Sequence, residues 1–487
     1  MAQHEHQIYE GQRRQTGHLL SLTARSIGIM TFLTLMCFLV TNICSYLYID
    51  SFYTNHHDNT PQNLLPLISF NKGDAVYTDV EESHRKTILV TANSDNYKNK
   101  WSRPTIHIVS TRFMQNQGSL VHLGRARLAL FKAVCLPTVL GQTVMPKGEE
   151  ANDPAFLWII KIDPELDYSL RYEMIELLQP YSNFYLVGSN DNVGFGDGGG
   201  NWRGGEVGEK LMQLINDGML YTGDLATLRR AYHFREDRVV LETRLDADDG
   251  LNVNYLETIQ SNANTTFSGF STDGKKKKKA KWKYWCAQNN LDWYPALSAT
   301  WGNNNYGDIG SLVPIQSPHF CITPGLTLGF GIGTVGKSVP QYPHDKIVEI
   351  VKQTGGCGLA YKSCFQMIDN PEISAIRSRT PTSAGMKDMA PTKKKMENLM
   401  RMAAEFDADG TIIKRLGQMF GINEDTIQHT TTHIRDNLLF MSEDNLRGQC
   451  TKGHSCKVES KEALQQIVDL AGNGRVNGAE TVKITVE

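Results

Sequence analysis

The sequence lacks an excess of charge of either sign, since its 487 residues carry a formal net charge of −2. Without a basic surplus there is no general attraction to polyanions, so we expect no nucleic-acid partner. Nine cysteines are too few for a disulfide-dense scaffold of this length. Internal repeats are also missing. Hydrophobic residues make up 40% of the chain, which predicts a globular protein of one large or two modest domains.

Two nucleotide-binding motifs are missing as well. The glycine-dense segment 193–205 does not have the Gly-x-Gly-x-x-Gly spacing directly after a strand, and it has no Gly-Lys-Ser/Thr. We therefore predict neither a dinucleotide-binding Rossmann site nor a P-loop, and interpret this segment as a connection between elements.

One long uncharged apolar run is present, at residues 27–49, and its length suits a membrane-spanning helix. Residues 1–26 before it contain three arginines, which by the positive-inside rule makes them a cytosolic tail. The polar segment 50–103 then forms a stem, and the rest lies in the lumen of the Golgi or endoplasmic reticulum. Asn264 opens an Asn-Thr-Thr glycosylation sequence that would be lumenal. The alternative is a buried helix of a soluble protein.

From residue 105 the hydrophobic pattern becomes regular. Strands are predicted at 106–109, 156–162, 184–187 and 238–245, and helices at 125–134 and 168–178. Strands that alternate with helices indicate βαβ units and a mainly parallel sheet, so the fold class is α/β.

An acidic segment follows the last of these strands. Asp246, Asp248 and Asp249 come directly after it, Gly250 is expected to break the strand, and Asn252 is expected to cap the next helix. Clustered carboxylates repel one another unless a cation joins them, and Mg²⁺ and Mn²⁺ prefer such oxygen ligands. The alternatives are a solvated acidic turn and a calcium loop, which would need glycine where Leu251 stands.

The string Arg244-Leu-Asp-Ala-Asp-Asp-Gly-Leu251 resembles the rhamnosyltransferase family of GT-A glycosyltransferases. Further similar strings begin at Ser110, Leu123, Leu136 and Ser317, so the resemblance covers roughly residues 105–350. It implies a GT-A domain over 104–380. This domain would transfer a sugar, with rhamnose implied by the family's name, from a nucleoside diphosphate donor to a hydroxyl of a glycan or glycoprotein acceptor. The cofactor would be Mn²⁺ or Mg²⁺.

The resemblance and the strand ends together make six residues candidates for binding the donor: Thr111, Arg112, Arg125, Asp163, Arg244 and Asp246. A guanidinium can bind phosphate through two parallel hydrogen bonds, although Arg112 can equally be a surface ion pair. Asp163, at the end of the second strand, would meet the base. Arg127 is interpreted as part of a solvated helix face.

The metal would be held by Asp246 and Asp248, with His344 as a further ligand and His319 as its rival. An inverting transfer also needs a carboxylate base near the acceptor hydroxyl. Asp292 and Asp308 are candidates for that base, and Asp249 would hold the acidic segment or face the donor sugar.

Residues 381–487 are interpreted as a linker and a C-terminal helical region. Cys357/Cys364 and Cys450/Cys456 are close enough in sequence to pair in an oxidising compartment. The opposing functional class is a non-catalytic, membrane-tethered protein that binds glycans or calcium. Binding of a nucleotide sugar would discriminate between the two classes.

Overall fold

The structure is a computed structural model. It describes residues 101–145, 153–190, 206–268, 278–296, 309–317, 321–334, 336, 339–340, 344–354, 356–360, 363–380, 393–437 and 440. The predicted cytosolic tail, the span at 27–49, most of the stem, the glycine-dense segment, His319, Asp308 and the pair Cys450/Cys456 lie outside these residues. Within the described part of the chain, no helix is both long enough and apolar enough to cross a bilayer.

The strands are β1 (Thr105–Phe113), β2 (Leu157–Ile162), β3 (Phe184–Gly188), β4 (Val239–Arg244), β5 (Asp249–Leu251), β6 (Trp282–Ala287), β7 (Asn289–Tyr294), β8 (Ser311–Gln316), β9 (Thr327–Phe330), β10 (Phe365–Ile368) and β11 (Ala375–Ser378). The helices are α3 (Val121–Leu130), the π-helical turn η2 (Phe131–Cys135), α4 (Leu136–Leu140), α5 (Tyr168–Leu178), α6 (Glu206–Asn216), α7 (Leu225–Phe234), α8 (Tyr255–Phe267), the 3₁₀ turn η5 (His344–Lys346), α9 (Ile347–Thr354), α11 (Lys393–Phe406), α12 (Ile412–Phe420) and α13 (Glu424–Asp436).

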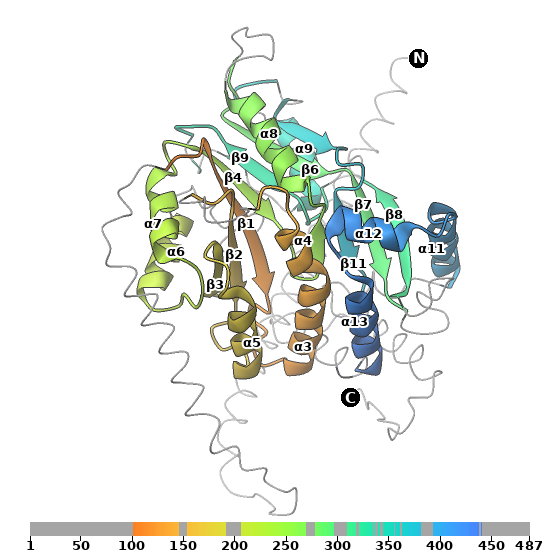
Figure 1. Ribbon diagram of the computed structural model, residues 1–487. Helices are drawn as coiled ribbons and strands as arrows, with labels where there is room; N and C mark the ends of the chain where they lie inside the picture. The colour runs from red at the N-terminus through yellow and green to blue at the C-terminus, as the bar shows by residue number, and fades with distance from the viewer. Residues whose placement is uncertain are drawn as a thin grey trace, which may run out of the picture. The chain divides into compact units, whose positions relative to one another are not determined.

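The main sheet has seven strands in the order β10-β6-β9-β4-β1-β2-β3, drawn in Figure 1. Only β9 runs antiparallel to its neighbours β4 and β6, and the other pairings in this sheet are parallel. The predicted α/β class with a mainly parallel sheet is therefore confirmed.

Both faces of the main sheet are covered, which explains why β2 is buried along its whole length. On one face, β1 residues Val109 and Phe113 pack with apolar side chains of α3, η2, α5 and α8. On the other face, Ile106 and Ile108 pack with side chains of α6, α7 and α9. Because neighbouring residues of a strand point to opposite faces, β1 contributes to both cores.

A second sheet has the order β5-β11-β7-β8. Strand β11 runs parallel to β7 and antiparallel to β5, and β7 runs antiparallel to β8. Side chains of β7, β8, α11, α12 and α13 share one hydrophobic core with Ala133 and Val134 of η2. The described C-terminal helices thus pack on the sheet that carries Asp249 at its edge.

The predictions for Gly250 and Asn252 are wrong. Residues Asp249–Leu251 form β5 instead of ending in a break, because they pair with β11. A Cβ atom at Gly250 would lie 2.6 Å from the Thr138 Cγ2 atom and 2.9 Å from the Ile376 Cγ2 atom, so glycine permits close packing here. Asn254 occupies the N-cap position of α8, whereas the buried Asn252 accepts a hydrogen bond from the Asn254 N–H at 3.0 Å.

Among the described cysteines, Cys357 pairs with Cys364, as the sequence predicts for an oxidising compartment. A second disulfide joins Cys286 of β6 to Cys321, which are separated by 35 positions in the sequence. Both bridges lie in the core on the α6–α7 side of the main sheet. Cys135 is a buried free thiol, and burial raises its pKa, as do the nearby Asp249, Asp248 and Asp246 carboxylates.

Candidate functional site

The strand order creates a switch point between β1 and β4. After β1 the chain adds β2 and β3 on one side, and it then returns to add β4 on the other side of β1. In open parallel sheets, ligands bind outside the carboxyl ends of the strands at such a point. Arg112 is the penultimate residue of β1, and Asp246 follows the end of β4 by two residues. The fold therefore places the acidic segment where a ligand is expected.

The acidic segment is a tight turn between β4 and β5. The Asp249 N–H donates to the Asp246 carbonyl oxygen at 3.1 Å. The side chains of Asp246 and Asp248 are partly exposed, at 35% for Asp246, whereas Asp249 is buried. Two of the three carboxylates are thus open to a ligand, and the third faces the protein interior.

Asp249 anchors the turn. Its Oδ1 atom accepts a hydrogen bond of 3.1 Å from the Ser378 N–H of β11. Burial raises the pKa of Asp249 well above its usual value, and the Asp248 and Asp246 carboxylates raise it further, against the opposing effects of Arg377 and the Ser378 bond. A buried carboxylate with these contacts suits the role of holding the segment. Its role toward a donor sugar stays a prediction.

Two arginines lie beside the acidic turn. The Arg244 Nε atom is 3.8 Å from the Asp246 Oδ1 atom. Arg127 of α3 donates to the Gln117 Oε1 atom at 2.6 Å; burial lowers its pKa, while Asp248 and Asp246 raise it. The interpretation of Arg127 as a solvated residue is therefore wrong.

The π-helical turn η2 follows α3 and packs against β5. Arg125 is the exposed one, and it donates to the Ser169 Oγ atom at 3.0 Å. Sequence spacing alone does not show which of Arg125 and Arg127 is buried, because this depends on the elements that pack against α3.

Thr111 and Asp163 lie at the ends of β1 and β2, and both are buried. Thr111 accepts a hydrogen bond of 2.8 Å from the Trp158 indole N–H. The Asp163 carboxylate accepts from the Gly118 and Glu165 backbone N–H groups at 3.2 and 2.9 Å, and from the Asn190 amide at 3.2 Å. Asp163 therefore ties together the segments that follow β1, β2 and β3. Contact of either side chain with a donor stays a prediction.

The candidate base Asp292 lies in β7 and is 3% exposed. Its Oδ2 atom accepts from the Arg379 Nε–H at 2.8 Å, its Oδ1 atom accepts from the Asn290 amide at 2.9 Å, and the Arg377 Nε atom lies 3.9 Å away. Two arginines and an amide therefore surround the buried carboxylate. These contacts describe an ion pair between β7 and β11, and they give no support to a role as the base.

His344 begins η5 and bonds through its Nδ1 atom to the Cys321 carbonyl oxygen at 2.8 Å. A carbonyl only accepts, so Nδ1 carries the proton and a neutral ring has its Nε2 lone pair available. Across the described ranges, however, no three His, Cys, Asp or Glu side chains are grouped so that they could hold a metal ion. Asp246, Asp248 and His344 are therefore not a preassembled three-ligand set. A pair of carboxylates still fits a cation that takes its other ligands from water and substrate phosphates.

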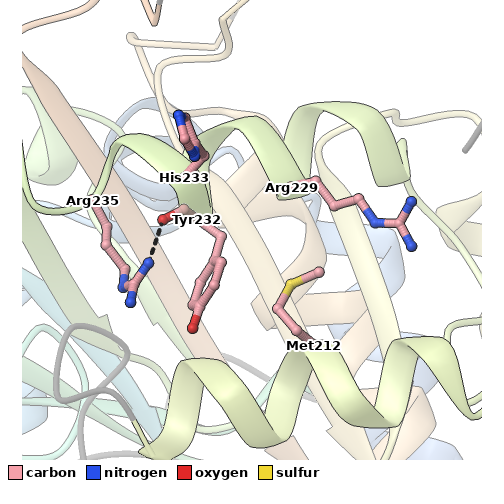
Figure 2. Close-up of a pocket in the computed structure, with 5 residues that line it drawn as sticks. All are labelled: Met212, Arg229, Tyr232, His233 and Arg235. Atoms are coloured by element: carbon pink, nitrogen blue, oxygen red, sulfur yellow. Dashed lines mark hydrogen bonds between the residues drawn. The ribbon is translucent and has the colours of Figure 1, made fainter. Parts of the chain in front are cut away.

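A separate pocket lies between α6 and α7, shown in Figure 2. It is lined by Met212, Arg229, Tyr232, His233 and Arg235. Helix α7 ends just before β4 begins, so Tyr232, His233 and Arg235 lie toward the amino end of that strand, opposite the acidic turn. None of the predicted site residues lines this pocket.

No family model matches the chain, and no curated protein matches it. One solved structure that resembles it is that of the glycosyltransferase TarS from S. aureus, with 9% identity and a TM-score of 0.24 over 75% of this chain. The match spans 55% of the TarS chain, about half its length. A likeness at this level assigns neither a fold nor a function.

Proposed function

We propose that this protein is a glycosyltransferase of GT-A type that moves a sugar from a nucleoside diphosphate donor to an acceptor hydroxyl. The observation that carries the proposal is the acidic turn between β4 and β5. It presents two partly exposed carboxylates at the carboxyl end of β4, next to the switch point of the sheet. If these carboxylates only contacted water, the acidic turn could lie anywhere on the protein surface.

In this proposal Asp248 and Asp246 would bind a divalent cation, and Asp246 would share it or bind the ribose. Bound there, the cation would supply Lewis-acid stabilisation of the departing diphosphate. Asp249 would hold the turn through the Ser378 N–H, and Arg127 and Arg244 would limit the mutual repulsion of the carboxylates.

Rhamnose is supported by the sequence resemblance alone, and the same holds for a glycan or glycoprotein as acceptor. Asp163 would meet the donor base if its contact with Asn190 opens.

We also propose that the domain folds in the lumen of the secretory pathway. Two observations support this location. The buried disulfides Cys286–Cys321 and Cys357–Cys364 need an oxidising compartment, and Asn264 is exposed on α8, where a glycan can be added.

The first prediction tests the transferase by hydrolysis and transfer assays across nucleotide sugars, with Mn²⁺ and with EDTA. Asp248→Asn should reduce the rate by about a hundredfold or more, because the substitution keeps the shape of the side chain and removes its charge. Asp237→Asn is the matched control, since Asp237 is exposed in the turn before β4 at the other end of that strand.

Activity that persists undiminished in EDTA would refute the metal-dependent mechanism. A protein that binds glycans and turns over no nucleotide sugar would instead belong to the non-catalytic class.

A further inference from the structure

Strand β5 directly follows the acidic turn and forms one edge of the second sheet. Its inner side pairs with β11, and on that side the Asn252 N–H donates to the Ser374 carbonyl oxygen at 3.0 Å. Because alternate residues of an extended chain direct their N–H groups to opposite sides, those of Asp249, Leu251 and Val253 lie on the outer side. These three donors need acceptors from outside the sheet, since an unpaired backbone N–H is costly away from water.

Three different parts of the chain accept these outer hydrogen bonds. The first N–H donates to the Asp246 carbonyl oxygen at 3.1 Å, within the acidic turn itself. The Leu251 N–H donates to the Thr138 Oγ1 atom of α4 at 3.3 Å. The Val253 N–H donates at 2.8 Å to the Met419 carbonyl oxygen, near the end of α12. The outer side of β5 is therefore bonded in turn to the acidic segment, to α4 and to the C-terminal helical region.

The end of α12 also packs closely against α4, and Figure 1 shows the two helices side by side. Gly421 ends α12 in a left-handed conformation with a φ angle of 66°, and a Cβ atom there would lie 3.3 Å from the Pro137 carbonyl oxygen. A Cβ atom at Gly141, just after α4, would lie 3.1 Å from the Val253 Cγ1 atom and 3.9 Å from the Gly421 Cα atom. The two helices and Val253 thus meet in a close-packed junction.

The position of the acidic turn depends on β5. Asp248 directly precedes this strand, and Asp249 opens it and anchors the turn through the Ser378 N–H. The strand has three residues and so few ladder bonds of its own. A strand this short gains little from pairing with one neighbour, so the bonds on its outer side contribute to holding it in place.

We propose that the end of α12, from Met419 to Gly421, positions the acidic turn through Val253 and β5. The C-terminal region 393–437 then works as part of the catalytic unit, together with the GT-A domain predicted over 104–380. The role of the turn as a cation site rests on the proposed function. The positioning of β5 rests on the contacts of Val253 and Gly421 alone.

The test compares Gly421→Ala with its matched control Gly410→Ala, both in the full chain. Each glycine has a φ angle of 66°, so an alanine meets similar backbone strain at either position. A Cβ atom at Gly410, however, would have nothing within 4 Å, whereas one at Gly421 would press on α4. The difference between the two variants therefore reports the contact between α12 and α4.

The first measurement is hydrogen exchange of the amides at 249–253, which needs neither metal nor substrate. These amides should exchange at least about fivefold faster in Gly421→Ala than in Gly410→Ala, because overpacking at the junction weakens the bond between Val253 and Met419. The amides of β2 are the internal reference, and they should exchange alike in both variants.

The second measurement is Mn²⁺ binding, followed by electron paramagnetic resonance. Mn²⁺ should bind about tenfold more weakly to Gly421→Ala than to Gly410→Ala, because carboxylates that are less firmly oriented lose metal affinity. If Gly421→Ala does not fold, Gly141→Ala tests the same junction. Its Cβ atom would press on Val253, and its φ angle of −76° suits alanine.

Equal exchange at 249–253 in the folded variant and in Gly410→Ala would overturn the positioning role. Faster exchange with unchanged Mn²⁺ affinity would confine the effect to β5 and overturn the positioning of the carboxylates. Faster exchange in a protein whose wild type binds no Mn²⁺ and turns over no nucleotide sugar would keep the positioning of β5 and remove the transferase. Wild-type turnover, with exchange unchanged in Gly421→Ala, would keep the transferase and overturn the positioning.

Discussion

Acid should destabilise this protein through a single buried histidine, His107 of β1. Its ring is 1% exposed and bonds at both nitrogens. The Gln260 amide nitrogen lies 3.2 Å from the Nδ1 atom, and the same amide donates to the Ala155 carbonyl at 2.9 Å, which fixes its orientation. Because an amide nitrogen only donates, Nδ1 must accept. The proton is therefore on Nε2, which donates to the Thr243 Oγ1 atom at 2.8 Å, and the ring is neutral.

Burial lowers the pKa of His107 from 6.5 to about 3. Between these two values the unfolded chain binds a proton that the folded chain does not bind, so stability is complete above pH 6.5 and is lost as the pH falls toward 3. With these pKa values, the loss at pH 5 relative to pH 8 is about 2 kcal/mol from this residue alone.

The assay is urea unfolding at pH 8 and pH 5, on the wild type and on His107→Gln. Glutamine retains an amide that can bond to Thr243 but does not titrate. Other groups titrate equally in both proteins, so the drop in unfolding free energy between the two pH values should be about 2 kcal/mol smaller in the variant. The same drop in both proteins would refute the inference that His107 is held neutral.

Three further predictions concern stability and modification. Asp292→Asn should cost about 3 kcal/mol in urea unfolding, because it breaks a buried ion pair with Arg379, and the folded variant should keep its turnover; a selective loss of turnover without loss of stability would make Asp292 the base after all. Gly250→Ala should cost about 1–3 kcal/mol through its contact with Thr138, measured in the same way, and a neutral result would contradict the close packing of β5 on α4. Asn264→Gln should remove one glycan, seen as a mobility shift that glycosidase treatment of the wild type reproduces; an unglycosylated wild type would count against a lumenal location.

Local pattern was enough to predict the first part of the fold. The apolar run at 156–162 and the helical stripe at 168–178 needed no information from distant residues, and both appear as β2 and α5. The pairing of Cys357 with Cys364 is also local, because only seven positions separate the two cysteines. The strand before Asp246 was predicted because its apolar and β-branched residues alternate with a period of two. This strand, β4, places the acidic turn at the carboxyl edge of the sheet.

The surroundings of each charged group depended on the tertiary structure. Nothing in the sequence near Arg127 indicates that this arginine lies close enough to Asp248 and Asp246 for their charges to raise its pKa. Lys161 looks like a single polar residue in an apolar strand until the register places Arg112 beside it. The partner of Asp292 is Arg379, which directly follows β11 and is 87 positions away in the sequence. Periodicity determines which face a residue occupies, but the charges it meets there come from strands and helices that are distant in sequence.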